Sequence, residues 1–238
     1  MKETGITIFM IFLSFLNYAQ NRFFVGVGMI QQTCDPYTYI DNGPLIKTSN
    51  RVFIAPQEPE FKFMLGISLY NKLAFELNFK LKDYFIGYQN NLVKNGVSSG
   101  YTGSLKTFQI PAKVKYEIDL GKNFFLSPQV GASLAIETID YFDMTFRFVD
   151  VPEYKSTEVI VSRDNSVFLL GLVGLECEYR FFKRHKIGIG FEYFKGWRDL
   201  ITRVISYQVT GDATNYSAKI FGKGDYFSFG LTYRIGLF

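Results

Sequence analysis

The chain has 238 residues, and its formal net charge of +4 is small for this length and spread along the sequence. Such a balance is too mild and too scattered to indicate a nucleic-acid-binding protein. Hydrophobic residues make up 47% of the chain and include 26 phenylalanines and 16 tyrosines. Beyond the N-terminal region, no run of about 18 apolar residues occurs, so a transmembrane helix is excluded there. The aromatic excess favours β-strands.

The N-terminal region has the features of a secretory signal peptide. Lys2 precedes an apolar run over residues 6–16 that is too short to cross a bilayer as a helix, and Ala19 occupies a position suited to cleavage. We therefore expect residues 1–19 to be removed, and the alternative is a buried N-terminal helix. The remaining residues 20–238 are within the size range of a single β-barrel domain in an exported compartment.

Eight strand-like stretches follow along the mature chain. Most of them alternate apolar with polar or small residues, which is the pattern of a strand with one apolar face. An even number of strands is typical of outer-membrane barrels. We expect strands at residues 22–30, 61–70, 73–88, 107–120, 124–137, 167–182, 187–195 and 226–238.

The connections between these strands alternate between long and short. Tight turns are expected near residues 71–72, 121–122 and 183–185, and residues 158–162 suggest a hairpin above the membrane. In outer-membrane barrels, short turns face the periplasm and long loops face outside. An N-terminus that starts in the periplasm makes the first long connection extracellular, so topology and loop length agree. The four expected extracellular loops cover about residues 31–60, 89–106, 138–166 and 196–225.

Charged side chains gather on one face of several expected strands. Along residues 73–82, Glu76 and Lys80 lie on the face opposite Leu77, and residues 108–120 repeat this pattern. A soluble barrel would turn these charges to water, whereas a membrane barrel turns them into its lumen and its apolar residues to lipid. Alternation alone fits both, but the leader, the loop lengths and the C-terminal strand favour the membrane barrel.

The inward charges of such a barrel should form a network of ion pairs. Eight strands leave an interior that side chains can fill, and unpaired buried charge is costly. Seven positive and six negative residues nearly cancel, which predicts a plugged lumen rather than a wide pore. The alternative is that these charges only stabilise the barrel. The expected luminal network consists of Lys62, Glu76, Lys80, Lys82, Lys113, Lys115, Glu117, Asp119, Glu176, Glu178, Arg180, Glu192 and Arg234.

The C-terminal stretch alternates large apolar residues with small or polar ones and ends on an aromatic residue. Its polar-x-Gly-x-x-apolar-x-apolar pattern is similar to the signal that the barrel-assembly machinery of bacteria reads. The expected signal residues are Ser228, Gly230, Tyr233, Ile235 and Phe238.

Together with the leader and residues 108–116, this stretch resembles the outer-membrane β-barrel domain family of small Gram-negative surface proteins, related in shape to OmpA and OmpX. The resemblance covers essentially the whole mature chain. It implies an all-β fold, an eight-stranded antiparallel up-and-down transmembrane β-barrel in the cell outer membrane, and it assigns no chemistry.

Residues with catalytic potential are few. His185 is the single histidine and is expected to be solvated in a periplasmic turn, and the nucleophile-elbow, phosphate-loop and zinc-protease motifs are absent. Glu176 and Glu178 are spaced to lie on the same face of their strand, but nearby luminal lysines favour ion pairing over acid–base catalysis. Cys34 and Cys177 are expected on opposite sides of the membrane, so a disulfide is not expected. The sequence therefore predicts no enzyme, no metal and no cofactor.

The expected function is a structural or surface-binding role through the four extracellular loops, since rigid scaffolds commonly carry recognition on loops. The expected partners are outer-membrane lipid, the barrel-assembly machinery and an extracellular protein or glycan, with no nucleic acid. Two alternatives stay open. One is a narrow channel for ions or small solutes, and the other is a soluble exported lipocalin-like barrel that binds an apolar ligand.

Overall fold

A computed structural model describes most of the mature chain. The described residues are 22–33, 38–41, 51–52, 59–69, 72–90, 99–141, 154–163, 167–199, 201–209 and 213–237. The expected leader, Cys34 and Phe238 lie outside these ranges. Over the described ranges, no helix combines the length and the hydropathy needed to cross a membrane.

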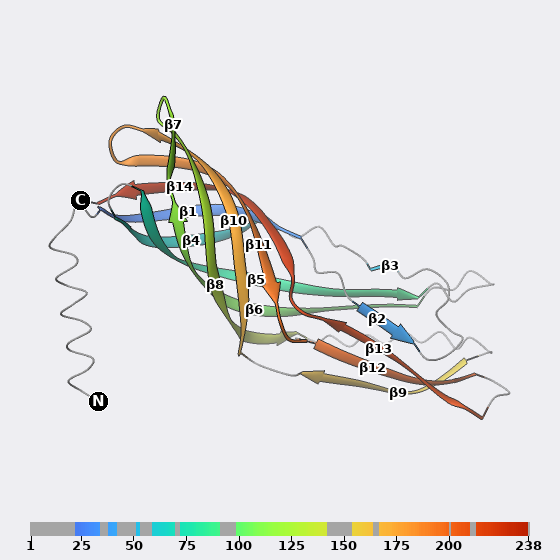
Figure 1. Cartoon of the computed structure of the whole chain (residues 1–238). Coiled ribbons are helices and arrows are strands. Elements are labelled where there is room, and N and C mark those ends of the chain that lie inside the picture. The colour runs from blue at the N-terminus through green and yellow to red at the C-terminus, as the bar shows by residue number, and fades with distance from the viewer. Residues whose placement is uncertain are drawn as a thin grey trace, which may run out of the picture.

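Eight long strands form a closed barrel in which all neighbouring strands are antiparallel (Figure 1). Each strand pairs with the next one along the chain, and the last pairs with the first, which closes the ring. The expected eight-stranded up-and-down barrel is thereby confirmed. The barrel strands are β1 (Arg22–Gln32), β4 (Glu60–Leu69), β5 (Leu73–Asn90), β6 (Ser99–Tyr116), β8 (Phe124–Tyr141), β10 (Val167–Phe181), β11 (His185–Gly196) and β14 (Tyr226–Gly236).

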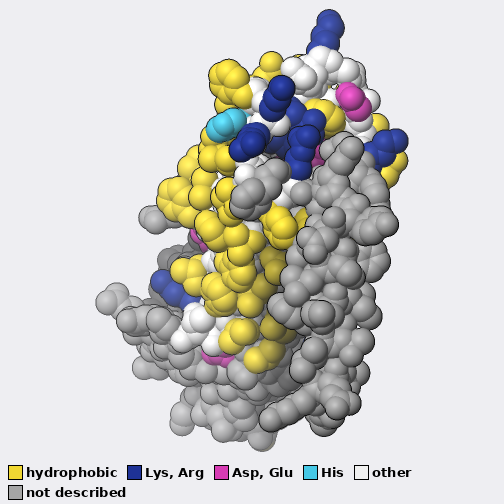
Figure 2. All heavy atoms as spheres, turned by 90° about the vertical axis from the view of Figure 1, so that its left-hand side faces the viewer, with side chains coloured by type: hydrophobic (Ala, Val, Ile, Leu, Met, Phe, Trp, Pro, Cys, Tyr) yellow, Lys and Arg dark blue, Asp and Glu magenta, His cyan; other side chains and the backbone are white. Residues whose placement is uncertain are grey.

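Side chains along the barrel strands alternate between the outer surface and the lumen. In β5, Leu77 is 45% exposed, whereas Glu76 and Asn78 on either side of it are 2% and 1% exposed. The same alternation runs along β10 and β14. Apolar side chains therefore cover the outside, as the yellow band in Figure 2 shows. Charged side chains inside and apolar side chains outside are the arrangement of a barrel surrounded by lipid, and the expected facing is confirmed.

This inside-out arrangement fits a barrel in the outer membrane of a Gram-negative cell, the location that the sequence predicts. A soluble lipocalin-like barrel would need its charges outside, so that alternative is wrong. The short turns between β4 and β5 and between β10 and β11 lie at one end of the barrel, close to the end of β14 (Figure 1). Because short turns face the periplasm in outer-membrane barrels, we assign this end to the periplasm.

The hairpin of β5 and β6 is longer than the sequence indicates. The two strands stay paired as far as Asn90 and Ser99, so most of the loop expected at residues 89–106 is strand. Glycines at several positions of this stretch weaken the strand pattern. At the other end, Glu117 separates β6 from a short strand, β7 (Ile118–Gly121), where a single strand over residues 107–120 is expected.

A second sheet of four strands forms from the first, third and fourth long connections. Its strands are β2 (Thr38–Asp41), β9 (Tyr154–Arg163), β12 (Ile201–Val209) and β13 (Asn215–Gly222), in the order β2-β13-β12-β9, all antiparallel. β3 (Arg51–Val52) pairs with the far end of β5. The expected hairpin at residues 158–162 falls in β9, whereas β2, β12 and β13 are expected as loop. Pairing between segments so distant in sequence leaves little local signal.

An arginine on the lipid-facing side should destabilise the barrel. We expect Leu77→Arg and Val173→Arg each to lower the free energy of unfolding by about 2 to 4 kcal/mol, because a charge near the bilayer midplane loses its hydration. Urea unfolding of protein refolded into lipid vesicles measures this loss. The apolar substitution Leu77→Phe is the control and should unfold like the original chain. If both arginine variants keep the original stability, the two faces have been assigned in reverse.

Candidate functional site

Eight charged side chains from six strands meet inside the barrel. Four are positive and four are negative, and each is at most 6% exposed. They come from β4, β5, β6, β10, β11 and β14, where alternation turns every second side chain inward. We call these eight residues the charge layer: Lys62, Glu76, Lys113, Lys115, Glu176, Glu178, Glu192 and Arg234.

Arg234 is the centre of the charge layer. Its Nε donates to Glu76 Oε2 at 2.9 Å, and its two terminal nitrogens bind both oxygens of Glu176 at 2.8 and 2.9 Å. One of these nitrogens also lies 3.0 Å from Glu178 Oε1. A guanidinium has five donors in a planar fork, so a single arginine from the last strand can bind carboxylates from β5 and β10 together.

Lys115 completes the pairing of the two β10 carboxylates. Its Nζ lies 2.6 Å from Glu176 Oε2 and 2.5 Å from Glu178 Oε1. Charge-assisted hydrogen bonds of this length are the stronger kind, and the buried site strengthens them further. Both carboxylates are thus held by a lysine from β6 on one side and by Arg234 from β14 on the other.

A second group of pairs continues the charge layer toward the extracellular side. Lys113 Nζ lies 2.5 Å from Glu192 Oε1 and 3.0 Å from Glu76 Oε1. Glu192 also lies 3.8 Å from Lys62 Nζ and accepts a hydrogen bond of 3.3 Å from Gln129 Nε2. Glu76 therefore links this group to Arg234, and every carboxylate in the charge layer has at least one cation as a neighbour.

Several neutral residues that the charge pattern does not reveal also shape the charge layer. Thr232 donates a hydrogen bond of 2.5 Å to Glu176 Oε1. A Cβ atom at Gly188 would lie 2.6 Å from that same carboxylate oxygen, so a side chain there would force the carboxylate to shift. At Gly26 it would lie 3.0 Å from Cγ of Arg234. Their inward position in the alternation is the signal by which the sequence could reveal them.

An aromatic layer fills the lumen on the extracellular side of the charge layer. The rings of Phe194 and Tyr226 stack with centroids 4.4 Å apart, and the Tyr226 hydroxyl donates to Gln109 Oε1 at 2.5 Å. Leu170 and Leu172 are buried in the same cluster. Lys80, expected in the ion-pair network, forms no ion pair within the described part of the chain, and its Nζ lies 3.9 Å from the centre of the Phe194 ring.

Other residues of the expected network lie apart from the charge layer. Asp119 lies in β7, where all four residues are exposed, so its expected place in the lumen is wrong. Its carboxylate accepts a hydrogen bond from Gly121 N. Lys82 is buried near the extracellular end, with its Nζ 3.4 Å from Thr33 O. Arg180 lies at the periplasmic end, 3.4 Å from Glu117 Oε2.

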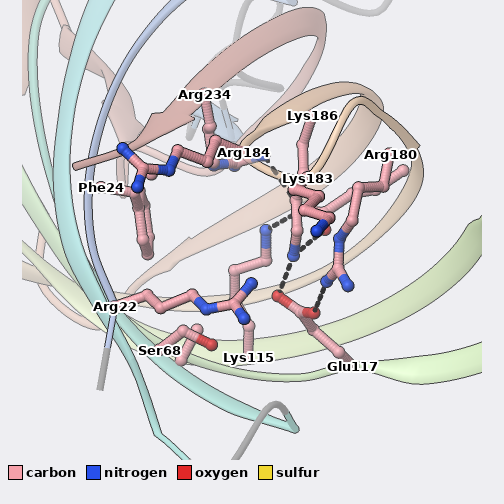
Figure 3. A pocket seen from close by; sticks show the side chains of 13 residues that line it. Arg22, Phe24, Ser68, Lys115, Glu117, Arg180, Lys183, Arg184, Lys186 and Arg234 are labelled. Carbon is pink, nitrogen blue, oxygen red and sulfur yellow. Dashed lines mark hydrogen bonds and ion pairs between the residues drawn. The ribbon is translucent and has the colours of Figure 1, made fainter. Parts of the chain in front are cut away.

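A cavity of about 250 Å³ opens at the periplasmic end of the lumen, and we call it the periplasmic mouth (Figure 3). Buried Lys115, Glu178 and Arg234 form its floor. Glu117 pairs with Lys186 and Arg180 on its wall. The remaining lining residues are Arg22, Phe24, Ser68, Ala74, Lys183, Arg184 and Gly236.

The residues of the expected assembly signal alternate as the strand requires. Ser228 and Gly230 face the lumen, whereas Tyr233 and Ile235 are half-buried on the other face. The ring nitrogen Nδ1 of His185 and the Tyr233 hydroxyl share a hydrogen bond of 2.7 Å. The expectation that His185 is a solvated turn residue is wrong. The turn ends at residue 184, His185 is the first residue of β11, and its ring packs against Tyr233 of β14.

Chemistry other than ion pairing has little support in the described residues. Across those ranges, no group of three or more His, Cys, Asp or Glu side chains is placed to hold a metal ion. Cys177 is a free thiol on the outer surface of the barrel. The arrangement can therefore hold the barrel together, close its lumen and attract anions at the periplasmic mouth.

Comparison with known proteins gives similarity to solved outer-membrane proteins. No family model and no curated protein matches the chain. OprG from Pseudomonas aeruginosa has a TM-score of 0.46 and 9% identity, over 91% of this chain and 97% of that chain. AlkL, solved in DMPC bilayers, has a TM-score of 0.46 and 12% identity, over 93% of this chain and 92% of that chain. Neisserial surface protein A has a TM-score of 0.40 and 12% identity, over 90% of this chain and 96% of that chain. Similarities at this level assign no function to this chain.

Loss of Arg234 should destabilise the barrel strongly. We expect Arg234→Met to lower the free energy of unfolding by about 3 to 5 kcal/mol, because it leaves buried carboxylates with too little positive charge. Urea unfolding in detergent micelles measures the change. Lys195→Met is the control, since Lys195 pairs with Asp225 at an exposed site and should matter little. Equal losses in the two variants would contradict the central place of Arg234.

Proposed function

We propose that this outer-membrane barrel is closed to solutes by its own side chains and serves a structural or surface-binding role through its extracellular part. The observation that carries the proposal is the charge layer, in which eight paired side chains are each at most 6% exposed. Conduction needs a wetted path, and ions in the lumen would have to separate these pairs. Breaking a buried pair is costly, so the closed state is the stable one.

Charge balance also supports a closed lumen. A channel that selects ions uses a ring of charges of one sign facing water. Here Lys113 lies between Glu76 and Glu192, and positive and negative side chains alternate across the lumen. On the extracellular side, the stacked rings of Phe194 and Tyr226 add a second, less polar layer.

The four-stranded extracellular sheet supports a surface-binding role. β2, β9 and the β12–β13 hairpin come from three different connections, and their pairing joins these connections into one platform (Figure 1). Rigid platforms hold recognition residues in fixed positions and so lower the entropic cost of binding. An extracellular protein or glycan is the class of partner that such a surface would meet.

The base of the β12–β13 hairpin is fixed to the barrel. Asp225 accepts hydrogen bonds of 2.8 Å from Gly196 N and 3.2 Å from the Tyr193 hydroxyl, and it pairs with Lys195. A Cβ atom at Gly196 would lie 1.6 Å from Lys223 O, so the two ends of this connection approach as closely as only glycine permits. The platform is thus joined to β11 and β14 by short contacts.

Two further parts of the proposal concern assembly and catalysis. The terminal strand would be read by the barrel-assembly machinery through Ser228, Gly230, Tyr233, Ile235 and Phe238, a set that includes the outward residues of its periplasmic end. The protein would act without catalysis. Glu176 and Glu178 are both paired with Lys115 and Arg234, and this pairing favours a structural role for the two carboxylates over acid–base catalysis.

A closed lumen predicts electrical silence. Detergent-purified protein, shown to be folded by a change of gel mobility on heating, should give no unitary current steps in a planar bilayer. Heat-unfolded protein in the same detergent is the control for detergent artefacts. Reproducible steps whose ion selectivity changes in Lys113→Gln would make the protein a narrow channel and would contradict the closed lumen.

The extracellular platform predicts protection from hydrogen exchange. β12 is paired on both sides, with β13 and with β9, whereas β9 has one partner among the described strands. Amide exchange in β12 should therefore be slower than in β9, because more of its N–H groups are bonded. Mass spectrometry of the folded protein measures both strands in one experiment. Exchange in β12 as fast as in an unstructured peptide would contradict the platform.

A further inference from the structure

The periplasmic mouth carries more positive charge than its carboxylates neutralise. The charge layer beneath it is balanced, with four charges of each sign. Outside that layer, the only carboxylate among the described residues that line the mouth is Glu117, and five basic residues surround it. Figure 2 shows dark blue side chains gathered at this end of the barrel. The five basic residues are Arg22, Arg180, Lys183, Arg184 and Lys186.

The two carboxylates of the mouth already have partners. Glu178 is bound by Lys115 and Arg234 and lies 3.3 Å from Lys186 Nζ. Glu117 is bound by Lys186 and by Arg180. In contrast, three basic residues of the rim form no ion pair with any described carboxylate: Arg22, Lys183 and Arg184. Like charges that converge on one cavity repel one another, and a bound anion relieves this repulsion.

The backbones of two of the basic residues, Arg184 and Arg180, are held by hydrogen bonds to other segments of the barrel end. Gly236 N donates to Arg184 O at 2.8 Å, which joins the turn after β10 to the end of β14. Arg180 N donates to Asn123 O at 2.9 Å, and the Arg180 guanidinium lies 4.3 Å from the centre of the Phe125 ring. The backbone that carries Arg180 and Arg184 is therefore fixed, which reduces the entropic cost of binding a ligand there.

The shape of the mouth suits a small ligand that enters from the periplasm. Its volume of about 250 Å³ is near the lower limit of small-ligand pockets, which is about 300 Å³. The floor is buried and paired, so a ligand would be held there and not passed through. Figure 3 shows Arg22 reaching across the mouth from β1, with Arg180 and Lys186 on the opposite side.

We propose that the periplasmic mouth binds a compact phosphate-bearing anion with more than one negative charge, through Arg22, Lys183 and Arg184. Arginine forks match the oxygens of phosphate in pairs, and lysine adds positive charge. The phosphate could belong to a soluble periplasmic ester or to the headgroup of a lipid in the inner leaflet. Both sources present the same chemistry to the rim. The binding residues of the rim lie outside the charge layer, and the mouth is at the opposite end from the extracellular platform.

Calorimetric titration with inorganic pyrophosphate tests the site. The folded mature protein in nanodiscs of phosphatidylcholine, at low salt, should bind one pyrophosphate per barrel, and added salt should weaken the binding. Arg22→Gln and Arg184→Gln should each weaken it about tenfold, because each removes hydrogen bonds to a charged oxygen. These exposed side chains have no ion-pair partner among the residues that the structure describes, so folding should persist, as the change of gel mobility on heating would show.

Lys122→Gln is the matched control. It removes one positive charge from the same end of the barrel, in the turn before β8 and outside the mouth. Its pyrophosphate affinity should equal that of the original chain. Absence of saturable binding, or an equal loss in Lys122→Gln and Arg184→Gln, would overturn the proposal, because general surface charge would then explain the result.

A second titration separates the two sources of phosphate. In nanodiscs that also contain phosphatidylglycerol, competition with pyrophosphate would support the lipid headgroup as the natural ligand. Unchanged pyrophosphate affinity would support a soluble phosphate ester. If pyrophosphate fails to bind in both kinds of nanodisc, the mouth is not a phosphate site, whatever the conductance measurement shows.

Discussion

Charge neutrality inside a narrow lumen is the constraint on which the rest of the structure depends. Lipid surrounds the barrel, so the apolar residues of every strand face outward and the polar residues face inward. Eight strands leave an interior that side chains fill, and the inward charges therefore meet one another instead of water. Arg234 is useful only because Glu76 and Glu176 face it from other strands. The identity of each inward residue thus depends on partners across the lumen.

The need for charge neutrality is weaker toward both ends of the barrel, and different side chains fill the two ends. At the extracellular end, rings such as Phe194 and Tyr226 replace ion pairs, and Lys80 lies over a ring rather than beside a carboxylate. At the periplasmic end, water reaches the side chains, so Arg22 and Arg184 can keep a charge that would be too costly in the middle. The closed middle separates two surfaces, each free to have its own partner.

The sequence predicts the barrel well because alternation is a local property. It identifies the eight strands and the side to which Leu77 or Glu76 points. It does not predict depth along the barrel axis, and for this reason it places Asp119 in the lumen although β7 runs beyond the wall. It also overlooks Gly188, whose role is to leave space for a carboxylate that arrives from another strand. The extracellular sheet was missed because residues 38–41 pair with residues 218–221, far along the chain.

The position of Arg234 in β14 has a consequence for the order of assembly. The glutamates that it neutralises lie on β5 and β10, which precede β14 along the chain. Until the last strand joins β1 and β11, those carboxylates face the interior with part of their counter-charge missing. Ring closure and charge compensation therefore occur in the same step. A chain in which β14 is unpaired would therefore hold buried carboxylates with too little counter-charge, and this favours the closed ring over the open one.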